Sequence, residues 1–290
     1  MQVRRLSILG LGLLGGSLGL AVKSKISGCS VTGYAHRKET LDAALTTGAV
    51  DEGFSDPAEA VRGADLVVLC TPVLMISPLL RQIATSLTDG AVVTDVGSTK
   101  RSIVREGEEI LAGTGRHFVG SHPMAGSEKR GVQFAKADLY EGAVCITTPT
   151  GRTDPAALEK VEGFWKTLGM RLTRIEPDRH DQLLSDVSHL PHAVAGALVS
   201  MQDERALDIC GKGFLDLTRI AGGDAGLWRD ILLDNRDCVR ASLRGLRGQL
   251  DALEALLEKG DSEGIRRWLE SASARRQGLA GRRKSDDRGA

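Results

Sequence analysis

The sequence predicts two domains, an α/β domain with a doubly wound parallel sheet followed by an all-α domain. Three observations lead to this prediction. Short apolar segments alternate with helical patterns over residues 1–176, as in parallel sheets. A glycine-rich turn joins the first apolar segment to the first helix. From Pro177 onward strand patterns stop, and residues 177–280 are typical of helices. The charged segment 281–290 predicts a disordered tail.

The composition is that of a globular protein. The chain has 290 residues, of which 41% are hydrophobic and 26% charged, enough for a sizeable core. The formal net charge is zero, so we expect no general attraction to nucleic acid or to anionic membranes. We find no apolar run of the roughly 18 residues that a transmembrane helix needs. The five cysteines are scattered without a C-x-x-C pair, which favours free thiols and a cytoplasmic location.

The glycine-rich turn has the spacing and the flanks of a dinucleotide-binding loop. An apolar strand pattern over residues 3–9 precedes it, and a helical pattern follows it to Lys23. In this context the first glycine permits a tight turn, the second lets a pyrophosphate approach the backbone, and the third lets the helix pack on the strand. We therefore predict a Rossmann-type domain, with an ordinary strand–turn–helix connection as the alternative. The predicted cofactor contacts here are Gly10, Gly12, Leu13, Leu14 and Gly15.

The end of the second predicted strand, residues 29–35, bears on the choice of cofactor. In this fold an acidic residue at that point binds the ribose 2′-hydroxyl of NAD. This chain instead has Ala35, followed by His36 and Arg37. A small residue and a cation leave space and charge for a 2′-phosphate. We therefore favour NADP slightly, leave NAD open, and predict cofactor contacts from His36 and Arg37. A solvated loop cation is the alternative for Arg37.

Two further strands carry polar residues to the ligand-binding edge of the predicted sheet. Residues 66–70 and 91–96 are apolar runs typical of central parallel strands. Thr71 and Pro72 follow the first, and Ser98 follows the second. Because ligands bind at the carboxyl ends of parallel strands, Thr71 and Pro72 are predicted to contact the cofactor. Helical patterns between and after these strands cover residues 40–47, 56–62, 76–87 and 101–111.

The densest polar stretch runs from His117 to Glu128, after another short strand. We expect His122 to face the same crevice as Ser98, where a histidine can act as a general base at neutral pH. A turn histidine bonded to the backbone is the alternative. Strands over residues 144–148 and 171–175 complete the domain. Between them lies an amphipathic helix, with Asp154 as its cap and a proline at its first position.

The second domain is predicted from helical periodicity. Residues 178–201 are helical with a kink at Pro191. His189 and His192 share a face there, for ligand recognition or core packing; a third ligand at suitable spacing is missing, so we predict no metal. Apolar residues recur over residues 227–259, which predicts one helix of over 30 residues. Such a length is typical of a subunit interface and predicts a homodimer. A final helix covers residues 265–274.

Six stretches together resemble the prephenate dehydrogenase family, the TyrA-type enzymes of tyrosine biosynthesis. They occur in family order at residues 10–17, 70–72, 94–100, 120–128, 188–192 and 218–221. The resemblance implies an oxidoreductase that catalyses NAD(P)-dependent oxidative decarboxylation of prephenate to 4-hydroxyphenylpyruvate, or of arogenate to tyrosine. It also implies an intertwined dimer formed by the helical dimerisation domain. NAD-specific relatives carry aspartate where this chain has Ala35, which leaves the cofactor preference open.

The resemblance also implies a role for each matching site residue. It makes His122 the group that hydrogen-bonds the reacting hydroxyl and takes its proton, with Ser98 between this histidine and the nicotinamide. It makes Arg219 the partner of a substrate carboxylate, which suits the bidentate guanidinium. Further substrate contacts are implied for His189, His192, Ser127 and Glu128, the last at the mouth of the pocket.

Two other classes of function are alternatives at this point. A dehydrogenase of the β-hydroxyacid type also has two domains, but it uses a lysine beside an asparagine on the first helix of the second domain. Residues 178–201 contain neither residue type. A nucleotide-sensing protein without catalysis would not need His122, Ser98 and Arg219 together.

Overall fold

The computed structural model describes residues 3–126 and 129–286. The chain forms two compact units, Met1–Val239 and Arg240–Ala290. The predicted domain boundary between residues 176 and 177 lies inside the larger unit and stays a prediction. Within the described residues, no helix combines the length and the apolar character that crossing a bilayer requires.

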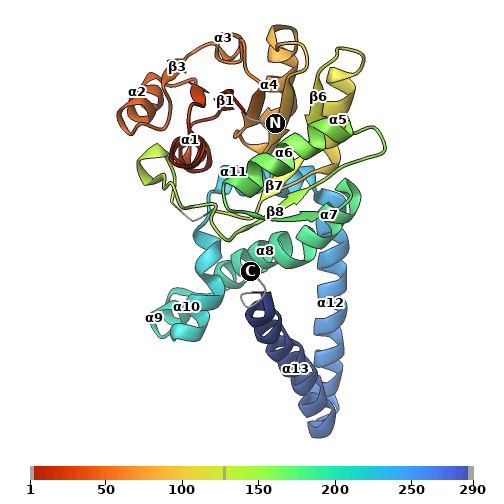
Figure 1. Cartoon of the computed structure of the whole chain (residues 1–290). Helices are drawn as coiled ribbons and strands as arrows, with labels where there is room; N and C mark the ends of the chain where they lie inside the picture. Colours follow the sequence, from red (N-terminus) through yellow and green to blue (C-terminus); the bar gives the residue numbers. More distant parts are fainter. Residues whose placement is uncertain (1–2, 127–128, 287–290) are drawn as a thin grey trace. The chain divides into compact units, whose positions relative to one another are not determined.

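Six parallel strands form the main sheet of the larger unit, in the order β3-β2-β1-β4-β5-β6. Figure 1 labels β3, β1 and β6 of this sheet. This is the strand order of a Rossmann-type sheet, whose direction of winding reverses between β1 and β4. The prediction of a doubly wound parallel sheet is therefore confirmed. The strands are β1 (Arg5–Leu9), β2 (Ser30–Tyr34), β3 (Glu52–Phe54), β4 (Leu66–Leu69), β5 (Val92–Asp95) and β6 (His117–Val119).

The core lies on both faces of this sheet. Val68 belongs to one cluster of buried apolar side chains, whereas its neighbours Val67 and Leu69 belong to another. Because successive strand residues point to opposite faces, β4 is buried on both sides, which explains its continuous apolar sequence. The connecting helices are α1 (Leu13–Lys25), α2 (Lys38–Thr46), α3 (Pro57–Ala60), α4 (Val73–Ile83) with η1 (Ala84–Ser86), and α5 (Arg101–Leu111).

The strands after β6 form a second sheet, which the sequence did not indicate. β7 (Ser121–Pro123) pairs antiparallel with β8 (Val144–Thr147), and β8 pairs parallel with β9 (Arg171–Arg174). A Cβ on Gly120 would lie 2.4 Å from Thr148 Oγ1 and 2.5 Å from Val104 Cγ2. Glycine is therefore required where the chain passes from one sheet to the other. η2 (Val132–Phe134) follows β7, and α6 (Pro155–Thr167), capped by Asp154 as predicted, precedes β9.

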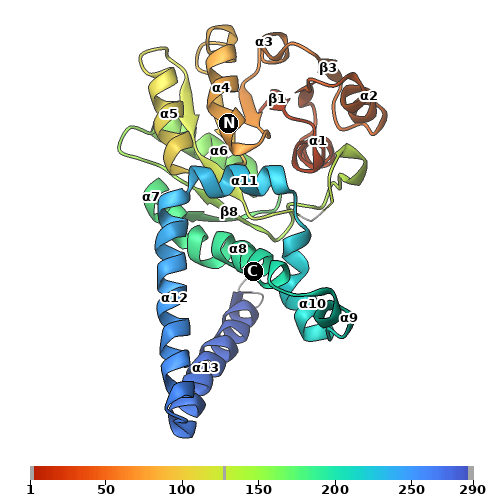
Figure 2. The same ribbon diagram turned by 180° about the vertical axis from the view of Figure 1, so that it is seen from behind.

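Helices continue from Pro177 to the end of the larger unit. They are α7 (Pro177–Leu184), η3 (Ser185–His189), α8 (Leu190–Ser200), α9 (Glu204–Asp208), α10 (Lys212–Thr218), η4 (Arg219–Gly222) and α11 (Ala225–Asp234). Helix α11 contacts α4, and Figure 2 shows α8 on the side of α11 away from α4. The interruption predicted at Pro191 takes the form of the π-helical turn η3, and Pro191 lies in the first turn of α8, where its missing N–H is tolerated.

The prediction of one helix over residues 227–259 is wrong. The chain breaks at Asn235 into α11 and α12 (Arg236–Glu258). Asn235 is 2% exposed, and its Nδ2 donates to the backbone oxygen of Asp181 at 2.8 Å. This buried hydrogen bond holds a residue whose backbone leaves helical geometry, with φ −100° and ψ 26°. Periodicity alone did not reveal the break, because the apolar pattern continues on both sides.

The smaller unit contains most of α12 and all of α13 (Ser262–Asp286). Gly260, with φ 61°, makes the turn between them. Helix α13 begins before and ends after the predicted range 265–274, and it enters the segment predicted to be disordered. Arg282, Arg283 and Lys284 favour helix there, and no proline interrupts them. Residues 287–290 lie outside the described part of the chain.

Candidate active site

The glycine turn between β1 and α1 combines two tight contacts with one open position. Gly10 has φ +108°, and a Cβ on it would lie 2.6 Å from the backbone oxygen of Cys70. A Cβ on Gly15 would lie 2.0 Å from the backbone oxygen of Gly10. By contrast, apart from its own chain neighbours, no heavy atom of the described residues lies within 4 Å of the position of a Cβ on Gly12. The fold itself requires Gly10 and Gly15, whereas Gly12 leaves free space in front of the helix.

The start of α1 fits the pyrophosphate of a dinucleotide. Its N-cap, Gly12, provides no side-chain hydrogen bond, and its first turn has no acidic residue. The free N–H groups and the positive end of the helix dipole are therefore available to an anion. Thr71 lies against Gly10, and within the described residues its buried Oγ1 has no hydrogen-bond partner. Leu13 and Leu14, in the first turn, are half-buried, and Pro72 is exposed.

The end of β2 lies beside the glycine turn, because Gly10 N donates to the backbone oxygen of Tyr34 at 3.0 Å. Ala35 follows directly and is 6% exposed. His36 and Arg37 are exposed, and Arg37 precedes α2 without capping it through its side chain. The structure thus places a small residue and two potential cations at the predicted ribose end of the site.

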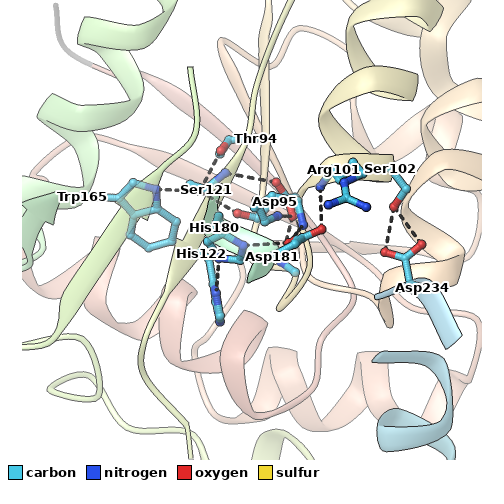
Figure 3. A network of polar contacts seen from close by, with 12 residues as sticks. Thr94, Asp95, Arg101, Ser102, Ser121, His122, Trp165, His180, Asp181 and Asp234 are labelled. Atoms are coloured by element: carbon cyan, nitrogen blue, oxygen red, sulfur yellow. Dashed lines mark hydrogen bonds and ion pairs between the residues drawn. The ribbon is translucent and has the colours of Figure 1, made fainter. Parts of the chain in front are cut away.

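His122 lies on β7 and starts a chain of buried polar contacts (Figure 3). Its Nδ1 lies 2.9 Å from Nε2 of His180, on α7. Nδ1 of His180 lies 2.8 Å from Oδ1 of Asp181. The Asp181 carboxylate also accepts the backbone N–H groups of Lys100 at 2.7 Å and Arg101 at 3.0 Å. The start of α5 is therefore connected to the His122 ring through two side chains of α7.

A second buried network fixes β7 against β5. Asp95 and Lys100 form an ion pair with both side chains 0% exposed, and Asp95 also accepts the N–H of Ser121 at 3.1 Å. The Ser121 hydroxyl donates to the backbone oxygen of Asp95 at 2.6 Å and accepts from Trp165 Nε1 at 3.1 Å. Burial raises the pKa of Asp95, although Lys100 opposes this effect. These contacts hold His122 close to the segment that contains Ser98.

The His122 ring is uncharged at neutral pH. Burial lowers its pKa well below the ordinary value, and the neighbouring His180, Lys100 and His189 act in the same direction. The residue as a whole is 7% exposed. A neutral imidazole can accept a proton, so the environment of His122 suits a general base.

The two histidines predicted to contact the substrate both lie against Trp228, on α11. His189 is fully buried, its Nδ1 lies 3.1 Å from Nδ2 of Asn235, and its ring meets Trp228 edge-on at 6.2 Å. The half-buried His192 stacks on Trp228 with ring centroids 3.3 Å apart. Burial lowers the pKa of His189 to about 4, against the influence of Asp181 and of the Ser98 backbone. Burial also lowers the pKa of His192.

The structure therefore gathers several of the predicted residues around His189, which interacts with the backbone of half-buried Ser98 and with His122. Arg219 is exposed on η4, which packs against α8, the helix of His192. Ser127 and Glu128 lie outside the described residues. Among the residues the structure describes, no three histidine, cysteine, aspartate or glutamate side chains are grouped to hold a metal ion.

Sequence reasoning missed His180, which contacts His122, and Asp181, which contacts His180. Both are buried on α7, together with Leu184. The i, i+3 and i, i+4 spacings to Leu184 place the two polar residues on the apolar side of the helix. A polar residue at a core position of an amphipathic helix was thus the available signal, but it does not identify the partner.

A Rossmann-type sheet, an open glycine turn and a buried neutral histidine define a dinucleotide-dependent dehydrogenase fold and site. The family model for the prephenate dehydrogenase nucleotide-binding domain matches residues 18–174, and the model for the prephenate dehydrogenase dimerization domain matches residues 176–271. The chain belongs to the prephenate dehydrogenase family.

Individual relatives agree with this assignment. The prephenate dehydrogenase of Bacillus subtilis is 36% identical over 282 residues, which are 95% of this chain and 76% of that protein. The structure of A. aeolicus prephenate dehydrogenase with hydroxyphenyl propionate and NAD+ superposes with a TM-score of 0.89 at 34% identity, covering 96% of this chain and 98% of that one. The structure of Synechocystis arogenate dehydrogenase superposes with a TM-score of 0.82 at 29% identity, covering 95% of this chain and 99% of that one.

Proposed function

We propose that this chain is an NAD(P)-dependent oxidoreductase that converts prephenate to 4-hydroxyphenylpyruvate, or arogenate to tyrosine, with loss of carbon dioxide. The observation that supports this most directly is the neutral, buried His122 held near the carboxyl edge of a dinucleotide-binding sheet. Relatives named prephenate dehydrogenase and arogenate dehydrogenase, matched over most of the chain, support the same reaction.

The reaction needs one base and a site for carboxylates. NAD(P), held by the glycine turn at the start of α1, would supply the acceptor for the hydride from the ring carbon that carries the hydroxyl. His122 hydrogen-bonds this hydroxyl and takes its proton as the carbon–oxygen bond becomes a carbonyl. The ring carboxylate leaves as carbon dioxide, and its bonding electrons enter the ring, which becomes aromatic. His122 then returns the proton to the phenolate oxygen, so no net proton is released.

The proposed substrate contacts come from the helical segment after Pro177. Arg219 binds a substrate carboxylate, and His189 and His192 line the pocket on the side of Trp228. The exposure of Arg219 on η4, next to the helix of His192, supports this assignment. Ser98 lies between His122 and the nicotinamide in the proposed arrangement, and Ser127 and Glu128 are proposed at the mouth.

Substitution of Arg219 with alanine is expected to raise the Michaelis constant for prephenate by roughly ten- to a hundredfold, because a charge-assisted hydrogen bond to a carboxylate is lost. The turnover number should change much less. Steady-state kinetics at saturating cofactor measure both constants. Arg205→Ala, at an exposed arginine of α9, is the matched control and should leave both unchanged. A normal Michaelis constant in Arg219→Ala would assign this residue to structure.

The cofactor is proposed to be NADP or NAD, with NADP slightly favoured. The small Ala35 and the exposed His36 and Arg37 leave room and positive charge for a 2′-phosphate. The pyrophosphate is proposed to bind at Gly10, Gly12, Leu13, Leu14 and Gly15, with Thr71 and Pro72 beside it.

The Ala35→Asp variant is expected to shift the ratio of kcat/KM with NADP to kcat/KM with NAD toward NAD by at least about tenfold. The new carboxylate would bind the ribose 2′-hydroxyl of NAD and repel a 2′-phosphate. Ala35→Asn has a similar volume without the charge and serves as the control. An unchanged ratio in Ala35→Asp would show that the ribose lies elsewhere.

The proposed activity is tested by mixing the purified chain with prephenate or arogenate and with NAD or NADP. Oxidation of either substrate produces reduced nicotinamide, which absorbs at about 340 nm. Turnover with at least one of the four combinations is expected, and chromatography should identify 4-hydroxyphenylpyruvate or tyrosine. Absence of turnover in all four would refute the enzymatic function.

We also propose that the active form is a homodimer located in the cytoplasm. The match of residues 176–271 to a dimerization domain supports the homodimer. The same match begins next to the predicted boundary between a dinucleotide-binding domain, 1–176, and a helical domain, 177–280.

A further inference from the structure

We propose that His180 and Asp181 fix the tautomer of His122, so that Nε2 of His122 is the nitrogen without a proton and faces the substrate hydroxyl. His180 is then a positioning residue that acts through His122. The inference rests on the proposed role of His122 as the base, and it adds the question of which ring nitrogen takes the proton and why.

The first step is the charge of Asp181. Its carboxylate accepts two backbone N–H groups, from Lys100 at 2.7 Å and Arg101 at 3.0 Å. These N–H groups belong to the start of α5, where the helix dipole favours a negative charge. Although burial opposes ionisation, the hydrogen bonds from His180 and from these backbone groups lower the pKa of Asp181. Asp181 is therefore an ionised group that can only accept hydrogen bonds.

The second step follows the protons outward from this carboxylate. Because Asp181 only accepts, Nδ1 of His180, 2.8 Å away, must carry the proton. Burial lowers the pKa of His180 despite the opposing effect of Asp181, so its ring is neutral and its Nε2 has a free electron pair. Nδ1 of His122, 2.9 Å from that nitrogen, must then be the donor. In the neutral ring of His122 the unprotonated nitrogen is consequently Nε2.

Among the described residues, the contacts of the neighbouring groups favour no different placement of these protons. The titratable groups that face the two rings are Asp95, Lys100, Asp181 and His189. The ammonium group of Lys100 forms an ion pair with Asp95, so the charges of these two residues neutralise each other. Nδ2 of Asn235 donates to the backbone oxygen of Asp181 and so holds Asp181, the last residue of this series of contacts, in place.

The arrangement also stabilises the protonated state of His122 during turnover. When Nε2 takes the substrate proton, the ring becomes a cation whose Nδ1–H already donates to His180. His180 in turn donates to an ionised carboxylate. In other enzymes a carboxylate orients the catalytic histidine directly, and here Asp181 would do so through His180. Loss of the acceptor on His180 would free His122 to turn or to place its proton on Nε2, where it could not act as a base.

Two substitutions at residue 180 separate positioning from packing. Asparagine places its amide near the position of Nδ1, so His180→Asn keeps a donor for Asp181 but leaves His122 without an acceptor. Glutamine reaches the position of Nε2, so His180→Gln offers its Oε1 to His122. We expect kcat to fall by roughly a hundredfold in His180→Asn and by less than about tenfold in His180→Gln, with the Kd for cofactor within about twofold in both. Equal losses in the two variants, or none, would contradict the inference.

A spectroscopic measurement tests the tautomer without activity. Long-range ¹H–¹⁵N correlations of the chain without substrate or cofactor report which ring nitrogen of His122 carries the proton, and the signals are assigned by their loss in His122→Asn. We expect the Nδ1–H form in the unmodified chain and in His180→Gln, and a mixture in His180→Asn. An Nε2–H form in the unmodified chain would overturn the inference even if turnover is normal. Absence of turnover beside an Nδ1–H spectrum would instead refute the proposed function.

Discussion

Replacement of His122 with asparagine is expected to lower kcat by roughly two to four orders of magnitude while leaving the affinity for the cofactor close to normal. Asparagine can place its amide near Nδ1 and so keep a hydrogen bond to His180, which lies 2.9 Å from that nitrogen. It has no group at the position of Nε2, so the base is lost and the packing is kept. Stopped-flow or steady-state measurement of reduced nicotinamide gives kcat, and fluorescence titration gives the Kd for the cofactor.

His117→Asn is a suitable control, because His117 is a half-buried histidine of β6 outside the contacts of His122. The pH profile supplies a second criterion. Since burial lowers the pKa of His122, the neutral form persists below the ordinary pKa of about 6.5, and kcat/KM should decrease only at more acidic pH. Unchanged turnover in His122→Asn, or an acidic limb that survives the substitution, would remove His122 from the mechanism.

Replacement of Lys100 with methionine is expected to lower the free energy of unfolding by about 3–5 kcal/mol, because it leaves the carboxylate of Asp95 buried without its counter-charge. Both side chains are 0% exposed, so water cannot replace the ammonium group. Urea unfolding monitored by tryptophan fluorescence at pH 7 measures the loss. The change also removes the support of the segment that carries Ser98, so activity should fall with stability.

Arg105→Met provides the matched control at an exposed position of α5, the helix that Lys100 precedes, and it should lower the free energy of unfolding by less than about 0.5 kcal/mol. In Lys100→Met the folded-state pKa of Asp95 rises further above its unfolded value. The folded state of this variant then gains stability as the pH falls, so its deficit should shrink in acid. The double variant with Asp95→Asn should recover part of the loss. A deficit below about 1 kcal/mol at pH 7 would mean that the buried pair contributes little.

The parts of the fold that follow from local patterns were predictable. The glycine turn, the apolar runs of β4 and β5, and the helix begun by Asp154 and Pro155 are each set by residues adjacent in sequence. The position of His122 shortly after a strand of the main sheet followed from the apolar run that precedes it. Resemblance to a family added roles that no local pattern could give, such as the one for Arg219.

The contacts between distant segments were not predictable. Asp181 accepts the N–H of Lys100 across 81 positions of the chain, and no periodicity identifies such a pair. The break at Asn235 depends on a hydrogen bond to the backbone of Asp181, again a distant segment. Between the two sheets, Thr148 and Val104 leave no space for a Cβ on Gly120, a restriction that only the folded chain reveals.

The anchoring of α5 has a consequence for how the enzyme works through its cycle. Lys100 and Arg101 donate to Asp181, and Ser102 donates to Asp234, so the start of one helix is tied to both α7 and α11. A hinge near residue 176 would have to rupture these bonds at every opening. We therefore expect residues 177–239 to travel with the nucleotide-binding sheet as one body. The distance that the hydride crosses would then be fixed by the fold, and closure of residues 177–239 onto the sheet would not be required.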